Sequence, residues 1–252
     1  MSGHSHWSTI RRKKEANDAK RGAVFTKIAR EIVIAAREGG GDPESNIRLR
    51  MVLEKARAAG MPKDNIERAI KRGTGEDKDA AALIETFYEG YGPNGVAMMI
   101  DVVTDNRNRT VAAIRHLLTR HGGSLAESGA VAWQFERKGL INVPASVDFD
   151  TLFEAAVEAG ADDVVAGEGE DDHEVYTEPS DLHAVSEALK AAGIPISQMD
   201  LVMVPKNEMS LSTADAVQVL KLIEKLEDLD DVRRVFSNLD VTAEAVAAFE
   251  TA

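Results

Sequence analysis

The order of the strands and helices that the sequence predicts between residues 139 and 204 constrains the fold of this chain most. Short apolar segments alternate there with two amphipathic helical segments, and glycines, prolines and charged turns separate them. The predicted elements are, in order, strand Leu140–Val143, helix Phe149–Ala159, strand Asp163–Ala166, strand Glu174–Thr177, helix Asp181–Ala192 and strand Ile196–Val204. This βαββαβ order is typical of the ferredoxin-like fold, so residues 139–204 are expected to form an α+β domain.

The elements predicted before this domain form an incomplete unit. They are, in order, strand Glu85–Tyr91, strand Val96–Val103, helix Arg107–His121 and strand Ala130–Phe135. A closing helix and a closing strand are missing, and residues 213–228 and 232–238 supply both patterns. We therefore predict that residues 78–138 and 205–252 form a discontinuous α+β domain, into which residues 139–204 are inserted.

Residues 1–77 predict a basic arm followed by a small helical bundle. Apolar residues recur at helical spacing from Gly22 to Arg37, and three glycines at 39–41 end that helix. Asp42 and Pro43 are the expected N-cap and first helical residue of a second helix, and Pro62 is expected to open a third. The predicted fold class is thus α+β, with an N-terminal three-helix bundle plus two ferredoxin-like α+β domains, one inserted in the other.

Charge is distributed unevenly along the chain. Its 252 residues include 30 Lys and Arg and 43 Asp and Glu, a formal net charge of −13. Residues 1–75 hold 17 basic and 9 acidic side chains, whereas the remainder holds 13 basic and 34 acidic ones. The basic head can bind phosphate and the acidic body repels it, which predicts two kinds of contact surface.

Composition also narrows the class of protein. The chain has no cysteine, which excludes disulfides, thiolate metal sites and cysteine nucleophiles. No apolar run reaches the roughly 18 residues that a membrane span needs. Residues 1–14 are polar and basic, unlike a secretory signal. We therefore expect a cytoplasmic protein without a membrane partner.

The basic arm is the first candidate nucleic-acid-binding segment, because clustered Lys and Arg neutralise phosphates with little apolar demand. Trp7 lies beside the run of charges, where an aromatic ring can stack on an unpaired base. The alternative is a solvated tail whose tryptophan packs back on the bundle. The candidates in the arm are His4, His6, Trp7, Arg11, Arg12, Lys13, Lys14, Lys20 and Arg21.

The first predicted helix carries the second candidate surface. At about 100° per residue, its basic side chains fall in one arc opposite the apolar side. This arc predicts a nucleic-acid surface, and the alternative is an ordinary solvated face. Its members are Lys20, Lys27, Arg30 and Arg37.

Arg107 and Arg109 are the third candidate. They precede or open a predicted helix, where arginines oppose the helix macrodipole and so need another reason for being there. Free amides and two arginines together would suit a phosphate. The alternative is an Asp or Asn cap with the arginines paired to nearby carboxylates.

Signals for catalysis are weak. Residues 168–174 are rich in carboxylates but match no calcium loop, and a solvated turn between two strands explains them better. His116 and His121 miss the i, i+4 spacing of a shared metal. We expect no enzyme activity, no cofactor, no metal and no small-molecule substrate, and a hydrolase that uses the acidic cluster is the least favoured alternative.

Several motifs along the chain resemble the YebC/PmpR family. They are residues 2–7 (SGHSHW), 18–22 (DAKRG), 25–28 (FTKI), 40–44 (GGDPE), 89–93 (EGYGP), 104–110 (TDNRNRT) and 122–125 (GGSL). The similarity runs the length of the chain and is densest from 1 to 137. One departure is His6, where the family usually has lysine.

The resemblance implies a three-domain cytoplasmic protein without enzymatic activity. The bacterial family is described as probable DNA-binding transcriptional regulators, whereas mitochondrial relatives are translational activators. Some bacterial members are implicated in helping ribosomes through proline runs. The resemblance therefore implies a nucleic-acid partner, either DNA or ribosomal RNA with the ribosome as the larger target. The acidic segment 168–174 corresponds to a variable region of the family.

Overall fold

The structure is a computed structural model that describes residues 21–251, except 77–81, 168 and 170. The chain divides into two compact units. The first unit contains residues 21–132 and 218–235, and the second contains residues 133–217 and 236–251. The domain limits inferred above from the element order, 1–77, 78–138 with 205–252, and 139–204, stay a prediction.

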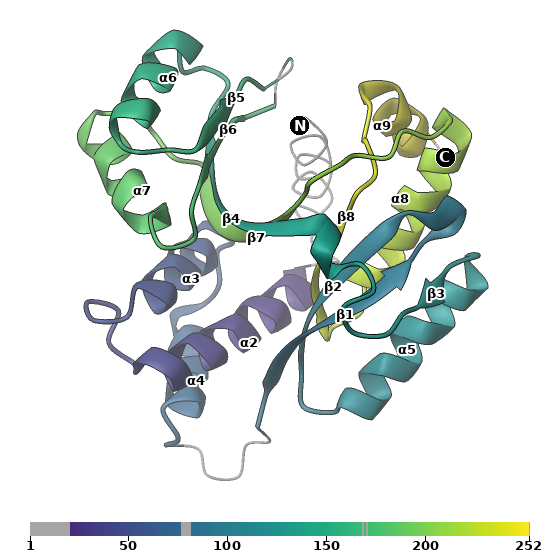
Figure 1. Ribbon diagram of the computed structural model, residues 1–252. Helices are drawn as coiled ribbons and strands as arrows, with labels where there is room; N and C mark the ends of the chain where they lie inside the picture. The colour runs from purple at the N-terminus through teal and green to yellow at the C-terminus, as the bar shows by residue number, and fades with distance from the viewer. Residues whose placement is uncertain (1–20, 77–81, 168, 170, 252) are drawn as a thin grey trace. The chain divides into compact units, whose positions relative to one another are not determined.

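Three helices open the first unit: α2 (Arg21–Gly39), α3 (Ile47–Ala58) and α4 (Lys63–Gly73) (Figure 1). Their apolar stripes meet in one core, in which Ile32 and Leu49 are fully buried. Gly73 lies at a close approach of α4 to α2, because a Cβ there would be 2.5 Å from the Val33 carbonyl oxygen. The predicted helical bundle is therefore present, and the missing side chain of Gly73 allows α4 to pack directly on the backbone of α2.

The start of α3 differs from the prediction. Asp42 and Pro43 form a turn, in which an Asp42 carboxylate oxygen accepts from Glu44 N at 3.0 Å, and the helix begins at Ile47. Asn46 is the N-cap, since its side-chain oxygen accepts from Leu49 N at 3.0 Å. Its amide nitrogen also donates to the Ala35 carbonyl at 2.8 Å. The buried amide of Asn46 caps the start of α3 and also binds a carbonyl near the end of α2, so Asn46 rather than the exposed Asp42 is the N-cap.

The first unit also contains a four-stranded sheet in the order β3-β1-β2-β8. The hairpin of β1 (Ile84–Tyr91) and β2 (Ala97–Thr104) turns at Pro93–Gly95, where Asn94 and Gly95 both have positive φ. β3 (Ser124–Leu125) pairs with β1, and β8 (Val232–Ser237) completes the sheet beside β2.

Two helices pack on one face of this sheet: α5 (Arg107–Arg120) and α8 (Thr213–Glu227) (Figure 1). Gly90 lies under Leu118 of α5, and Gly92 lies under Leu222 of α8. On the other face, Val103 of β2 joins the core of the bundle. The order of the strands differs from that in the sheet of the second unit, because here the first two strands form a hairpin in the middle of the sheet. The division between the two units falls within α8 and within β8.

The second unit holds a sheet in the order β5-β6-β4-β7. Its strands are β4 (Phe135–Val143), β5 (Asp163–Val165), β6 (His173–Thr177) and β7 (Gln198–Pro205). Helices α6 (Phe149–Glu158) and α7 (Leu182–Ala191) complete the βαββαβ unit, and α9 (Ala243–Glu250) follows later in the chain. This is the ferredoxin-like strand order, which confirms the predicted α+β fold class.

One predicted strand is wrong. Residues 130–135 were expected to be extended, but they contain a 3₁₀ turn at Ala132–Gln134 before β4 begins. The buried carboxylate of Glu89 accepts hydrogen bonds from the backbone N–H groups of Gly129, Val131 and Ala132 at 2.6–2.9 Å. A side chain, rather than a neighbouring strand, therefore satisfies the amides of this segment.

Gly73 offers a test of the helix contact. Gly73→Ala should lower the free energy of unfolding by roughly 1–3 kcal/mol, because the added methyl forces α4 away from the Val33 carbonyl. Gly22→Ala is the matched control: no atom lies within 4 Å of a Cβ at that helical position. The control should be neutral or stabilising by up to about 1 kcal/mol. Urea unfolding measures both, and equal effects would contradict the close approach.

Candidate nucleic-acid interface

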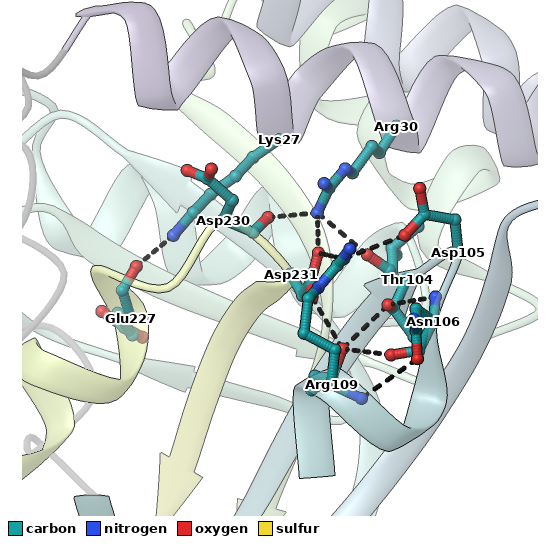
Figure 2. Close-up of polar contacts among 11 residues, drawn as sticks. Lys27, Arg30, Thr104, Asp105, Asn106, Arg109, Glu227, Asp230 and Asp231 are labelled. Carbon is teal, nitrogen blue, oxygen red and sulfur yellow. Dashed lines mark hydrogen bonds and ion pairs between the residues drawn. The ribbon is translucent and has the colours of Figure 1, made fainter. Parts of the chain in front are cut away.

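The basic side of α2 faces other parts of the first unit. Lys27 Nζ donates to the Glu227 carbonyl oxygen, and Arg37 donates to the Leu83 carbonyl oxygen. Arg30 donates to the Asp230 carbonyl oxygen at 2.6 Å and forms an ion pair with Asp231 at 2.7 Å (Figure 2). Three members of the predicted arc thus bind their own chain, and Lys20 lies outside the described residues. Their role in nucleic-acid binding stays a prediction.

Asp231 is the centre of this contact (Figure 2). Its carboxylate, whose side chain is 10% exposed, accepts from Arg30, from Arg109 at 2.8 and 3.0 Å, and from the Thr110 hydroxyl at 2.6 Å. Its carbonyl oxygen accepts from Val103 N at 2.9 Å. One residue therefore ties α2, the start of α5 and the end of β2 to the turn before β8.

The segment Thr104–Thr110 reaches Asp231 because a strand ends and a helix begins within it. Asn106 is the N-cap of α5, and its side-chain oxygen accepts from Arg109 N at 3.0 Å. The Thr110 hydroxyl lies 2.8 Å from that of Thr104, which in turn accepts from Asn106 N. These local bonds fix the first turn of α5 and direct Arg109 toward carboxylates.

The two arginines of this segment differ in their surroundings. Arg109 pairs with Asp105 at 2.9 Å as well as with Asp231. Arg107 is exposed, and no ion pair or hydrogen bond of its side chain occurs among the described residues. Carboxylate partners therefore explain why Arg109 stands at this helix start, whereas Arg107 has no such structural role.

The electrostatics of the cluster favour the charged form of Asp231. Burial by itself raises the pKa of this carboxyl, but hydrogen bonds from Thr110, Arg109 and Arg30 outweigh burial and hold the pKa below its ordinary value. Hydrogen bonds to Asp231 and Asp105 raise the pKa of Arg109. Both partners are thus charged at neutral pH.

A second charge network joins α3 to the sheet. Arg48 donates to both carboxylate oxygens of Glu85 at 2.7 and 2.8 Å, and Arg233 bridges Glu85 and Asp101. Burial raises the pKa of Asp101 to about 6, although Arg233 favours its charged form. Sequence reasoning missed this network, although Asp101 within the apolar pattern of β2 could have indicated it.

Other basic residues of the bundle are exposed. Arg57 lies at the end of α3, and Arg68 and Lys71 lie three residues apart on α4. Within the part of the chain that the structure describes, none of these three side chains has an ion pair or a hydrogen bond. Sequence reasoning counted them in the basic head but did not separate them from the basic residues that bind their own chain.

The arm lies outside the described residues. This applies to the candidates at positions 4, 6, 7, 11–14 and 20, and Arg21 is described only as the first residue of α2. Nothing in the structure bears on His4, His6, Trp7, Arg11, Arg12, Lys13 and Lys14.

The second half of the acidic segment is not solvated. Its described residues from Asp171 to Glu174 are buried. His173 Nδ1 accepts from Gly167 N at 3.0 Å, while its Nε2 lies 3.0 Å from the Val147 carbonyl oxygen. The histidine therefore closes the loop between β5 and β6 and draws its neighbours inward. Among the described residues, no group of three or more His, Asp or Glu side chains is arranged to hold a metal ion.

Comparison with known proteins places this architecture in one family. Residues 5–76 match the TACO1/YebC protein N-terminal domain, and residues 83–239 match the TACO1/YebC second and third domain. The chain therefore belongs to the TACO1/YebC family. No helix within the described residues is both long enough and apolar enough to cross a membrane.

The relatives are similar over their whole length. A protein from Acidithiobacillus ferrooxidans is 53% identical over 99% of both chains, and one from Trichlorobacter lovleyi is 51% identical over 97% of this chain and 98% of its own. Both are named probable transcriptional regulatory protein. The crystal structure of a conserved hypothetical protein from Aquifex aeolicus superposes with a TM-score of 0.83 at 46% identity, covering 89% of this chain and 92% of the other.

Asp231→Asn tests the central cluster. The free energy of unfolding at pH 7 should fall by roughly 2–4 kcal/mol, because Arg30 and Arg109 lose a charged acceptor in a largely buried place. The folded pKa of Asp231 is lowered, so its contribution is present above the unfolded value of about 3.9 and is lost as the pH falls below it. The difference between wild type and variant should therefore shrink at pH 3.

Asp230→Asn is the control for this measurement. The Asp230 side chain is exposed, and its contact with Arg30 uses the backbone carbonyl. Its effect should stay within about 0.5 kcal/mol at both pH values. A pH-independent difference for Asp231→Asn would show that the carboxylate charge contributes nothing.

Proposed function

We propose that this protein is a non-enzymatic, DNA-binding regulator of transcription that acts in the cytoplasm. The observation that carries the proposal is the separation of charge, with 17 basic and 9 acidic residues in positions 1–75 of a chain whose net charge is −13. A polyanion is attracted to such a head and repelled by the rest of the chain. The relatives named probable transcriptional regulatory protein support the regulatory role.

The basic head would bind through two parts. The arm supplies the run of four basic residues at 11–14, together with His4, His6 and Trp7. The bundle supplies Arg57, Arg68 and Lys71, whose exposed charges are free to meet phosphates. Each phosphate that Lys or Arg neutralises releases counterions, so affinity should fall steeply with salt.

The proposal includes no catalytic step, and the structural roles of two buried carboxylates, Glu89 and Asp231, support this. Glu89 binds three backbone N–H groups, and Asp231 binds two arginines and a threonine. Both therefore have structural hydrogen-bond partners that hold them in the charged form. The names of the relatives describe regulation rather than a reaction.

A second candidate function is a ribosome-associated translation factor that contacts ribosomal RNA and relieves stalling, for example at proline runs. Trp7 favours this alternative, because a tryptophan beside a basic run suits stacking on unpaired bases, which duplex DNA does not offer. An acidic body could then face basic ribosomal proteins. The two functions predict different effects of the same substitutions.

The triple variant Arg57→Gln, Arg68→Gln, Lys71→Gln tests the head. Its affinity for duplex DNA should fall, and the slope of log affinity against log salt should flatten by up to about 2.7, at roughly 0.9 per lost phosphate contact. Arg137→Gln, Lys190→Gln, Lys206→Gln removes the same charge from exposed positions of the second unit and should change neither quantity. Equal effects of both triples would mean that only net charge matters.

Trp7→Ala separates the two candidate functions. On duplex DNA its affinity should stay near wild type, whereas on ribosomes the loss of a stacked ring should cost roughly 1–3 kcal/mol of binding free energy. Binding to promoter duplex and to ribosomes at matched salt measures both. Ribosome binding that depends on Trp7, without selective duplex binding, would replace the transcriptional proposal by the translational one.

A further inference from the structure

Helix α5 differs in charge from the chain around it. Its sequence, RNRTVAAIRHLLTR, contains four arginines and a histidine but no acidic residue. Residues 76–252 hold only 13 basic side chains against 34 acidic ones, so almost a third of their basic residues lie on this one helix. A concentration of one charge sign on an exposed helix in an acidic region calls for an explanation.

The outer face of α5 has a defined pattern. Thr110, Ile114 and Leu118 are buried against the sheet. At about 100° per residue, Ala112 and His116 lie at the centre of the opposite face, with Thr119 and Asn108 next to Ala112. Arg115 lies on one flank of this face and Arg120 on the other, whereas Arg107, the first residue of the helix, is in line with the buried stripe. The exposed residues of this face are Asn108, Arg109, Ala112, Arg115, His116, Thr119 and Arg120.

Three arginines of α5 are available to a ligand. Arg107, Arg115 and Arg120 are exposed, and none of their side chains has an ion pair or hydrogen bond among the described residues. Arg109 differs, because Asp105 and Asp231 engage it. Three of the four arginines are therefore not needed for the contacts that hold α5 in place.

The charges at the two ends of the helix point the same way. Arg107 is the first residue of α5, where a cation opposes the macrodipole. At the other end, burial and then repulsion from Lys225 and Arg120 lower the pKa of His121. Lys225 of α8 thus adds positive charge beside the end of α5. The cation at the first position of the helix is unfavourable to folding, whereas the positive charges near its last turn complement the macrodipole.

We propose that the outer face of α5 binds duplex DNA, with the helix in the major groove and its arginines on the phosphates of both strands. This extends, and rests on, the function proposed above, and it assigns Asn108, Arg115 and Arg120 a role that the sequence did not suggest. An α-helix with its side chains is about 10–12 Å wide, which matches a major groove of about 12 Å. Over its 14 residues α5 spans about 21 Å.

The pattern of the face suits a groove of B-form DNA. The short side chains of Ala112 and Thr119 allow the helix to approach the base edges, and the amide of Asn108 can pair with the edge of an adenine. Arg115 and Arg120, on opposite flanks, can reach the two sugar-phosphate backbones. The major groove of A-form RNA is too deep and narrow for a helix, and this face carries no Phe, Tyr or Trp on which unpaired bases could stack.

The test compares variants on either surface of the first unit. Arg107→Gln, Arg115→Gln, Arg120→Gln should lower the affinity for duplex DNA at least tenfold at about 0.1 M salt and flatten the salt slope by up to about 2.7. Ala112→Glu places a carboxylate at the centre of the face and should reduce binding as strongly. Both changes lie on exposed helix positions, so thermal unfolding should match wild type. Asn108→Ala should weaken discrimination between duplex sequences without changing the slope.

The outcomes separate this inference from the proposed function. If the variant of Arg57, Arg68 and Lys71 loses duplex binding while the α5 triple and Ala112→Glu keep it, the α5 surface is refuted and the proposed function stands. If wild type binds no duplex DNA, the proposed function itself fails. If the α5 variants lose binding to structured RNA or ribosomes but not to duplex DNA, the assignment of the groove is wrong.

Discussion

The carboxylate of Asp231 is the interaction on which the arrangement of the first unit depends. It joins an arginine from the bundle, an arginine and a threonine from the start of α5, and through its carbonyl the end of β2. Asp231 is largely buried, and an unpaired charge there would be costly, so the four segments hold one another in place. The ion pair of Arg30 and Asp231 therefore has a structural role in the first unit.

This use of charge divides the basic residues of the chain into two classes. Lys27, Arg30 and Arg37 contact carbonyl or carboxylate oxygens of their own chain, whereas exposed residues such as Arg68 and Arg115 contact neither. The first class would have to break a contact before it could bind phosphate. The second class can bind without rearrangement, and both proposals above use it for that reason.

The parts of the fold that depend on local pattern could be predicted from the sequence. The βαββαβ order of the second unit and the apolar stripes of the bundle follow from periodicities within short segments. The prediction of a strand at 130–135 was wrong because the carboxylate of Glu89, some 40 residues earlier, accepts hydrogen bonds from the backbone amides of this segment. The predicted N-cap of α3 was wrong because Asn46, rather than Asp42, reaches the end of α2. In the site, Arg109 could be named but its partner Asp231 could not, since no local pattern connects residues 122 apart.

The separation of these partners has a consequence for how the protein is made. Arg30 and Asp231 are 201 residues apart, and β2 finds its outer neighbour only when β8 has been synthesised. At about 5–20 residues per second, the nascent chain waits roughly 10–40 s before the carboxylate that pairs with Arg30 leaves the ribosome. During that interval Lys27 and Arg30 of α2 lack their partners, and a hairpin edge is unpaired. Synthesis rate and early cleavage of the chain near its C-terminus therefore bear on whether this unit folds at all.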